Sequence, residues 1–209
     1  MEDVPCRPRH EKQKGSNLKK TIVNPSALGD AGQEECAMMR SRALIFLLLL
    51  AGCAGIPNGV EPVRGFDVNR YLGLWYEIAR LDHSFERGLV NVTAEYSLRD
   101  DGGIKVVNRG FDPGSKKWKE AVGKGYFVVG PDVGRLRVSF FLFFYGGYNI
   151  IEFDRENYSY ALVCGPSRKY LWILARGPEM DGQIMKGLIE KAKGLGFDTD
   201  KLIFVTHSP

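Results

Sequence analysis

Between residues 75 and 176 the sequence divides into short segments rich in β-branched and aromatic residues, each ended by turn-forming residues. The expected strands are 75–82, 92–99, 104–111, 118–129, 134–141, 147–154, 158–164 and 170–176. The connections include Asp100–Gly103 and Asp112–Ser115, which have the composition of tight turns. Strands that follow one another through short hairpins favour closure into a barrel, because closure leaves no unpaired edge. We therefore predict an all-β fold, an eight-stranded antiparallel up-and-down barrel.

The pattern changes after Pro178. Apolar residues then recur at spacings of three and four, at Ile184, Met185, Leu188, Ile189, Ala192 and Leu195. This spacing predicts a helix with one apolar face, which Gly194 and Gly196 bring to an end. A helix with a single apolar face is expected to pack against the outside of the barrel, and a last strand is expected at 201–206.

The segment Phe66–Ile78 predicts a short helical turn that leads into the first strand. Gly73 allows the backbone to bend sharply between the two. Trp75 begins the strand, where its indole can plug one end of a barrel. Arg176 ends the last of the eight strands, and a guanidinium placed over an indole contributes roughly 0.5–2 kcal/mol. We expect Gly73, Trp75 and Arg176 to close the barrel together.

This early Gly-x-Trp motif with a late Arg resembles the lipocalin family, over roughly residues 66–205. Asp154-Arg155 stands at the family's second motif, although its neighbours are altered. The segments Arg80–Gly88 and Phe144–Asn149 resemble the bacterial, apolipoprotein D-like lipocalins that are attached to the outer membrane. The resemblance implies a lipocalin barrel with the C-terminal helix outside it and a cavity for one small hydrophobic ligand.

A secretion signal precedes this domain. Arg40 and Arg42 are followed by the apolar run 43–50, which is too short to span a bilayer. The sequence Leu50-Ala51-Gly52-Cys53 resembles the lipobox of bacterial lipoproteins. That resemblance implies a diacylglycerol thioether on Cys53, cleavage before it and acylation of its amine, for example with palmitate. Several acyl chains give a stable membrane anchor. Because Ala54 rather than Asp follows, the resemblance implies the outer membrane, with the anchored domain on its periplasmic face.

The chain is therefore divided into four parts. Residues 1–37 are predicted to be an N-terminal extension from a misassigned start, with translation beginning at Met38 or Met39. Residues 38–52 are the predicted lipoprotein signal peptide. Residues 53–65 are the acylated Cys and a tether that contains Gly and Pro. Residues 66–209 are the predicted lipocalin domain.

Strand alternation, aligned by Trp75 and Arg176, predicts which side chains line the barrel. The predicted ligand-binding residues are Val106, Asn108, Val122, Lys124, Tyr126, Val138, Phe140, Tyr148, Ile150, Glu152, Tyr170 and Trp172. The apolar members suit an acyl chain, and Lys124, Asn108 and the tyrosine hydroxyls suit a headgroup. A buried Lys124 would need Glu152 or a ligand anion as its partner. The expected ligand is a fatty acid or lysophospholipid. Two reservations stand: the side chains could simply fill the barrel, and a one-residue shift of register would reverse each assignment.

Charge and cysteine content argue against several other classes of protein. The formal net charge is only +4, and the predicted domain has no run of Lys and Arg long enough to follow a phosphate backbone. We therefore expect no nucleic-acid partner. The four cysteines, at positions 6, 36, 53 and 164, match no zinc or CxxC pattern. Cys164 is expected to behave as a small apolar strand residue.

Catalysis finds little support in the sequence. His10, His83 and His207 are scattered, and no Gly-x-Ser-x-Gly motif occurs. We expect no cofactor and no metal, and we expect His83 to be a polar residue at the barrel rim. The prediction is a binding protein that holds or transports lipid in membrane maintenance or stress. A lipocalin-fold enzyme acting on a bound lipid, a haem binder and a homodimer are left open.

Overall fold

The computed structural model describes residues 55–208. The predicted extension 1–37, the signal peptide 38–52 and the acylation site Cys53 lie outside the described residues. Among the helices of the described part, none is both long and apolar enough to cross a bilayer.

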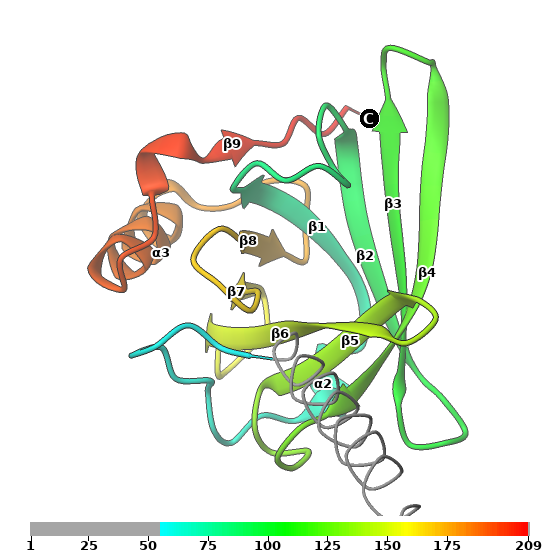
Figure 1. Cartoon of the computed structure of the whole chain (residues 1–209). Helices are drawn as coiled ribbons and strands as arrows, with labels where there is room; N and C mark the ends of the chain where they lie inside the picture. Colours follow the sequence, from blue (N-terminus) through cyan, green and yellow to red (C-terminus); the bar gives the residue numbers. More distant parts are fainter. Residues whose placement is uncertain (1–54, 209) are drawn as a thin grey trace, which may run out of the picture. The chain divides into compact units, whose positions relative to one another are not determined.

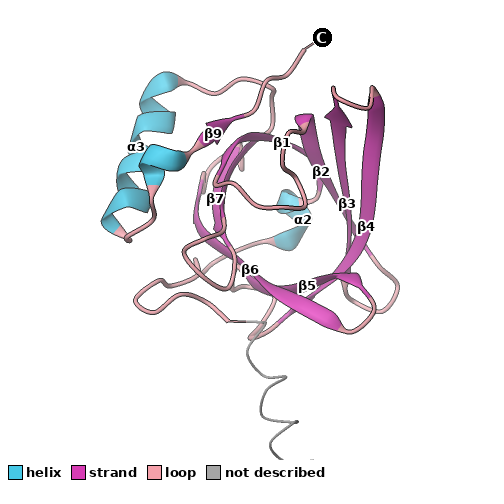
Figure 2. Ribbon diagram, turned by 45° about the horizontal axis from the view of Figure 1, so that its top comes forward, coloured by secondary structure: helices cyan, strands magenta, loops and turns pink. Residues whose placement is uncertain are grey.

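The strands form a closed antiparallel barrel. In chain order they are β1 (Gly73–Arg80), β2 (Val90–Leu98), β3 (Ile104–Asp112), β4 (Lys117–Phe127), β5 (Arg135–Phe141), β6 (Phe144–Phe153), β7 (Tyr160–Cys164), β8 (Leu171–Ala175) and β9 (Ile203–Phe204). Each of β2 to β8 pairs with the next in order, and β1 pairs with both β8 and β2, which closes the ring (Figure 2). The short strand β9 adds to β1 from outside. The predicted eight-stranded up-and-down barrel is confirmed.

Helices stand at one end of the barrel and on its outer side. The short α2 (Val68–Tyr71) precedes β1 and is seen through the ring of strands in Figure 2. The longer α3 (Gly182–Gly194) lies outside the barrel, as predicted (Figure 1). Asp181 caps α3, since its carboxylate accepts the backbone N–H groups of Gln183 and Ile184 at 2.8 and 3.1 Å. A 3₁₀ turn, η2 (Thr199–Lys201), then leads to β9.

Two apolar cores share the strands nearest to α3. On β7, Leu162 and Cys164 face outward and pack in one cluster with Leu188 and Ala192 of α3. Val163 faces inward, into a second cluster around Trp75, Tyr96 and Phe153. Strands buried on both faces carry continuous apolar runs, which is why β7 and β8 show no polar alternation. Burial raises the pKa of the Cys164 thiol to about 12, so this residue behaves as the apolar strand residue that we predicted.

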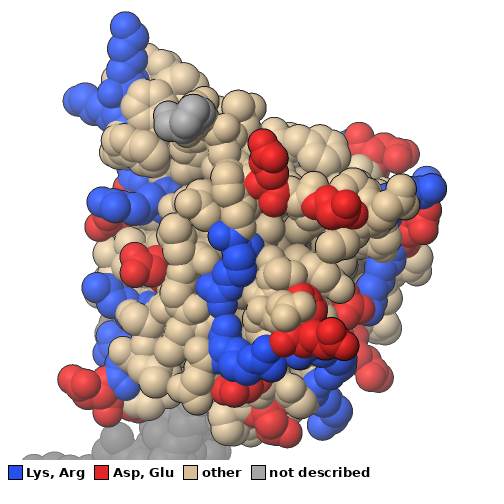
Figure 3. Space-filling model, turned by 180° about the vertical axis from the view of Figure 1, so that it is seen from behind, with Lys and Arg blue, Asp and Glu red and all other residues tan. Residues whose placement is uncertain are grey.

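Up-and-down connectivity places alternate loops at the same end of the barrel. The end opposite α2, here called the mouth, is formed by loops 81–89, 113–116, 142–143 and 165–170. On the face that Figure 3 presents, acidic and basic side chains are interspersed among neutral ones rather than gathered by sign. This agrees with the nearly balanced charge of the sequence.

Candidate functional site

The end of the barrel opposite the mouth is sealed by an indole and a guanidinium. Trp75 is fully buried, and its Nε1 donates a hydrogen bond to the carbonyl of Tyr71 at 2.8 Å. The Arg176 Cζ atom lies 4.0 Å from the centroid of the Trp75 ring, so the cation–π contact expected from the sequence is present. Arg176 also donates to the carbonyls of Arg70 and Leu74, at 2.8 and 3.0 Å. These bonds tie the end of β8 to α2 and to β1.

The backbone conformation at Gly73 explains why this position holds a glycine. Its φ of +92° is a conformation that residues with a side chain rarely adopt. A Cβ atom at this position would also lie 3.5 Å from Nη1 of Arg176, within ordinary contact distance. Strain in the backbone, more than lack of room, therefore explains glycine between α2 and Trp75.

Above this floor lies a small cavity with an apolar lining surface, beside a cluster of three tyrosine hydroxyls. The hydroxyl oxygen of Tyr148 lies 2.7 Å from that of Tyr71 and 2.8 Å from that of Tyr96. Burial raises the pKa of all three phenols, so they stay neutral and can donate or accept a hydrogen bond. The cavity has room for about one water-sized sphere, a volume of about 10 Å³. It is lined by Phe66, Tyr71, Tyr96, Ile104, Val106, Leu136, Val138 and Tyr148.

The structure directs most of the predicted lining residues into the barrel. Strand pairing, cluster membership and ring stacking place these residues on its inner face: Val106, Asn108, Val138, Phe140, Tyr148, Ile150, Tyr170 and Trp172. They belong to β3, β5 and β6 and to the region of β8. Their position is compatible with ligand contact, which stays a prediction.

The predicted orientation of β4 is wrong by one residue. Val106 on β3 pairs with Gly123, and directly paired residues point to the same side of a sheet. The outward-facing residues of β4 are therefore Val122, Lys124 and Tyr126, and the inward-facing ones are Ala121, Gly123, Gly125 and Phe127. The prediction extended the inward and outward alternation of β3 across a hairpin loop to β4. An error of one residue in that step reverses the predicted side of every residue in the strand. Gly123 and Gly125 also occupy inward positions, so β4 lacks the inward apolar residues that would have shown the correct alternation. Lys124 consequently cannot hold a headgroup inside the barrel.

Glu152 also faces outward, because of a β-bulge. The pairing of β6 with β7 shifts between Ile150 and Glu152, so the alternation restarts within the strand. Ile150 faces the interior, whereas Glu152 forms an ion pair with Lys191 on α3. The expected partnership of Glu152 with Lys124 is therefore wrong.

A second bulge brings two charged residues into the barrel that the sequence did not single out. The pairing of β1 with β8 shifts between Glu77 and Ala79, so both Glu77 and Arg80 point inward. They are 4% and 1% exposed, and Arg80 Nη1 donates to Glu77 Oε1 at 2.6 Å. Arg80 Nη2 donates to the carbonyl of Glu86 at 2.8 Å, which fixes loop 81–89. The sequence did contain a sign of this pair, because Glu77 and Arg80 stand three residues apart within an otherwise apolar strand.

Loop 81–89 adds further polar groups to this buried cluster. The Glu86 carboxylate accepts a hydrogen bond from Trp172 Nε1 at 3.1 Å, and His83 Nε2 lies 3.1 Å from the same oxygen. The His83 ring stacks on Phe85, with the ring centroids 4.0 Å apart. His83 lies in a loop of the mouth, where a polar rim residue was expected, but it is only 6% exposed. We call Glu77, Arg80, His83 and Glu86 the buried charge cluster.

The two carboxyls of this cluster have opposite pKa shifts. Burial, followed by the negative charge of Glu86, raises the pKa of Glu77 well above its usual value, although Arg80 opposes the shift. Burial also acts to raise the pKa of Glu86, but His83 and the hydrogen bond from Trp172 outweigh it, so that pKa lies below its usual value. Glu86 therefore carries the anionic charge more readily than Glu77.

The raised pKa of Glu77 leads to a prediction about pH. Above the ordinary pKa of a glutamate, folded Glu77 retains a proton that the unfolded chain releases, so stability falls as pH rises through the raised pKa. Glu77→Gln removes this proton, so its stability should decline less than that of the parent protein from about pH 5 upward. Urea midpoints measured across this range would show it. The exposed change Glu95→Gln should leave the profile parallel to the parent's, and a parallel profile for Glu77→Gln would contradict the prediction.

Comparison with known sequences points to one family. Residues 66–207 match the family model described as a lipocalin-like domain. "Outer membrane lipoprotein Blc" of Vibrio cholerae is 56% identical over 78% of this chain and 98% of its own length. The protein of the same name from Escherichia coli is 52% identical over 77% of this chain and 90% of its own length. "Temperature-induced lipocalin-1" of Arabidopsis thaliana is 38% identical over 68% of this chain and 80% of its own.

Solved structures agree on the fold. The cockroach allergen Per a 4 superposes with a TM-score of 0.58 at 18% identity, over 75% of this chain and 96% of the allergen. Insecticyanin from the tobacco hornworm Manduca sexta superposes with a TM-score of 0.56 at 20% identity, over 74% of this chain and 87% of its own. At such identities the likeness supports the barrel architecture alone.

Proposed function

Because this chain belongs to the lipocalin family, we propose that it binds a fatty acid or lysophospholipid inside its barrel while anchored to the outer membrane. The chain is an outer-membrane lipoprotein, in agreement with the names of its bacterial relatives. We assign the anchor to acylated Cys53, the tether to residues 53–65 and the binding domain to residues 66–209.

The observation that carries the proposal is an inner wall open to solvent near the mouth. Ala121 faces inward, since it pairs with Asn108, yet it is exposed. Phe140 faces inward beside Gly123 and is 43% exposed. Below this level the walls are apolar and aromatic outside the buried charge cluster, and this part suits an aliphatic chain. An aliphatic guest would enter here and displace side chains around the small cavity above the floor.

Polar groups inside the barrel support a ligand with a polar end. The Oδ1 atom of Asn108 is buried and has no hydrogen-bond partner among the residues that the structure describes. A buried acceptor without a partner is costly, so a ligand hydroxyl would find a favourable place there. Arg80 is already paired with Glu77 and with backbone carbonyls. We therefore assign the headgroup contact to Asn108 and its surroundings rather than to a lysine.

Blocking the inner wall tests the proposal. Ala121→Trp places a large ring inside the barrel at the solvent-exposed level, and Val122→Trp places the same ring on the outer face one residue later. We expect Ala121→Trp to weaken binding of a fluorescent fatty acid by about tenfold or more, equivalent to about 1.4 kcal/mol. Val122→Trp should bind as the parent protein does. Fluorescence titration measures both, and equal affinities for the two variants would contradict a ligand site within the barrel.

The proposed activity is binding without catalysis. Incubation with radiolabelled lysophospholipid should return the lipid unchanged, and release of labelled fatty acid would instead indicate a lipocalin-fold enzyme. For the haem alternative, an imidazole free to ligate iron would be needed. Of the two histidines in the described part, His83 directs Nε2 toward Glu86, and His207 Nε2 lies 2.9 Å from the carbonyl of Glu77. His83 is also only 6% exposed, and its burial in loop 81–89 together with the His207 contact favours a lipid over haem.

A further inference from the structure

An apolar hairpin turn projects from the mouth between β5 and β6. Phe141, Leu142, Phe143 and Phe144 are 66%, 63%, 88% and 68% exposed. No charged residue occurs between Arg137 and Glu152. Single apolar side chains are common on protein surfaces, but contiguous ones usually mark an interaction site. We call residues Phe141–Phe144 the apolar tip.

The turn residues themselves are unusual for a loop in water. Phe141 pairs with Phe144, so Leu142 and Phe143 form the whole turn. Leu142 has a φ of +47°, a conformation that in hairpin turns is normally supplied by Asn, Asp or Gly. A large apolar residue is strained there and gives the turn no polar side chain. The composition of this turn suits apolar surroundings rather than solvent.

The base of the hairpin has the character of a membrane interface. Arg137 on β5 lies over two tyrosines, with its Cζ 5.1 Å from the ring centroid of Tyr145 and 5.9 Å from that of Tyr126. Tyrosine and arginine combine an apolar body with a polar end, and both are favoured where hydrocarbon meets water. The hairpin therefore has apolar residues at its tip and amphipathic residues at its base. A segment that enters a lipid surface has the same order, with apolar residues in the hydrocarbon and amphipathic residues at the interface.

The chain leaves the barrel next to this hairpin. Gly55 lies against β6, where its carbonyl accepts a hydrogen bond from Asn149 Nδ2 at 3.3 Å. The approach is close, because a Cβ atom at Gly147 would stand 2.2 Å from the Gly55 oxygen. Cys53 is two residues before Gly55, so their Cα atoms are within about 7 Å of each other. Acyl chains on Cys53 would thus start close to the base of the apolar tip.

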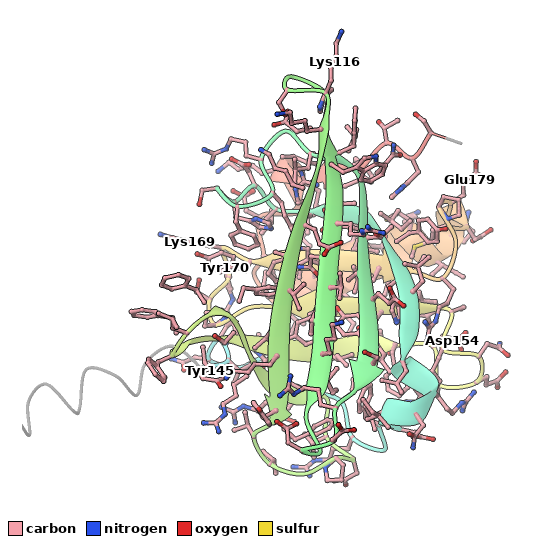
Figure 4. The ribbon with its side chains drawn as sticks, turned by 90° about the vertical axis from the view of Figure 1, so that its right-hand side faces the viewer. Lys116, Tyr145, Asp154, Lys169, Tyr170 and Glu179 are labelled. Atoms are coloured by element: carbon pink, nitrogen blue, oxygen red, sulfur yellow. The ribbon has the colours of Figure 1, made fainter. Side chains whose placement is uncertain are left out.

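We propose that the apolar tip inserts into the same lipid surface that holds the acyl chains of Cys53, so that the mouth of the barrel faces the bilayer. The proposal rests on the acylation of Cys53 put forward above. In Figure 4, Tyr145, Lys169 and Tyr170 lie on one side of the molecule, and the acidic Asp154 and Glu179 lie on the other. The side with Tyr145, Lys169 and Tyr170 is the one that the proposal turns toward the lipid.

Insertion of the tip would also connect the membrane to the ligand site. Phe140 faces the barrel interior, and the next residue, Phe141, is the first of the apolar tip. Because these two residues are adjacent in the chain, one strand end borders both the barrel interior and the apolar tip. A lipid could then pass between the bilayer and the barrel without crossing bulk water.

Depth-dependent quenching tests the docking. The acylated mature chain, which begins at Cys53, is reconstituted into phosphatidylethanolamine and phosphatidylglycerol vesicles. A bimane probe is attached to Phe143→Cys or, as the matched control, to the exposed Glu179→Cys on the opposite side. Cys164 is buried, so it does not compete for the label. We expect emission at position 143 to shift to the blue and a nitroxide-labelled phospholipid to quench it several-fold more strongly than emission at position 179.

The outcomes separate the docking from the anchor. Equal quenching at the two positions, on a chain whose Cys53 is shown to be acylated by mass spectrometry, would overturn the docking alone. A blue-shifted probe at position 143 that the lipid does not quench would indicate that a second copy covers the tip, and would also overturn it. A mature chain without acyl groups on Cys53 would refute the anchor and this docking with it. Phe143 is 88% exposed, so circular dichroism of its variant should match the parent's.

Discussion

Trp75→Ala is expected to lower the free energy of unfolding by about 3–5 kcal/mol. The indole is fully buried at the closed end of the barrel, where it packs against Tyr71 at a centroid distance of 4.6 Å. Its removal leaves a cavity, deprives Arg176 of its aromatic partner and frees the Tyr71 carbonyl. Urea denaturation followed by circular dichroism would measure the loss.

Trp118 supplies the matched control for this prediction. It is 62% exposed, with only an edge contact to Phe111. Trp118→Ala should therefore change the free energy of unfolding by no more than about 0.5 kcal/mol. Losses of similar size for the two variants would mean that the indole of Trp75 does not seal the barrel.

Arg80→Met should lower the free energy of unfolding by about 3–5 kcal/mol, because it removes one partner of a buried ion pair. The substitution leaves Glu77 without its cation and removes the hydrogen bonds that hold loop 81–89 by the carbonyls of Glu86 and Leu89. The loss should shrink as pH falls through the raised pKa of folded Glu77, because below it the carboxyl is neutral with or without Arg80. Urea denaturation at neutral and acidic pH checks both parts.

Two further variants test whether the unpaired Glu77 carboxyl causes this loss of stability. Adding Glu77→Gln to Arg80→Met removes the unpaired carboxyl, so the double variant should regain part of the lost stability. Arg87→Met breaks the exposed pair with Asp82 and should have no measurable effect. A double variant less stable than Arg80→Met alone would show that the uncompensated charge of Glu77 is not the cause of the loss.

The closure of the barrel was predictable because its signals are local or carried by distinctive residues. Turn residues mark the ends of the strands, and the observed strands begin and end within a few residues of the predicted ones. Trp75 and Arg176 stand out by residue type, and their contact follows once the barrel closes. The helix α3 was equally evident, since its apolar spacing repeats over several turns.

The lining of the barrel was predictable only where the strand phase was known. Val106 and Trp172 face inward, as predicted. The inward and outward alternation of their strands follows correctly from the alignment by Trp75 and Arg176. The phase failed on β4, where a hairpin loop intervenes and glycines replace apolar side chains at the inward positions. It failed again at Glu152, beyond a bulge. A bulge is defined by which residues of neighbouring strands pair, so the amino-acid sequence of one strand gives little indication of it.

By itself, the sequence determined the number and order of the strands, the outer helix and the sealed end, since turns, periodicity and rare residue types are properties of neighbouring residues. Only the tertiary structure decided that Glu77 and Arg80 share the interior, that Lys124 does not, and that Gly55 lies beside the apolar hairpin. Those outcomes depend on register and on contacts between distant segments. A displacement of one residue changes them while leaving every local pattern intact.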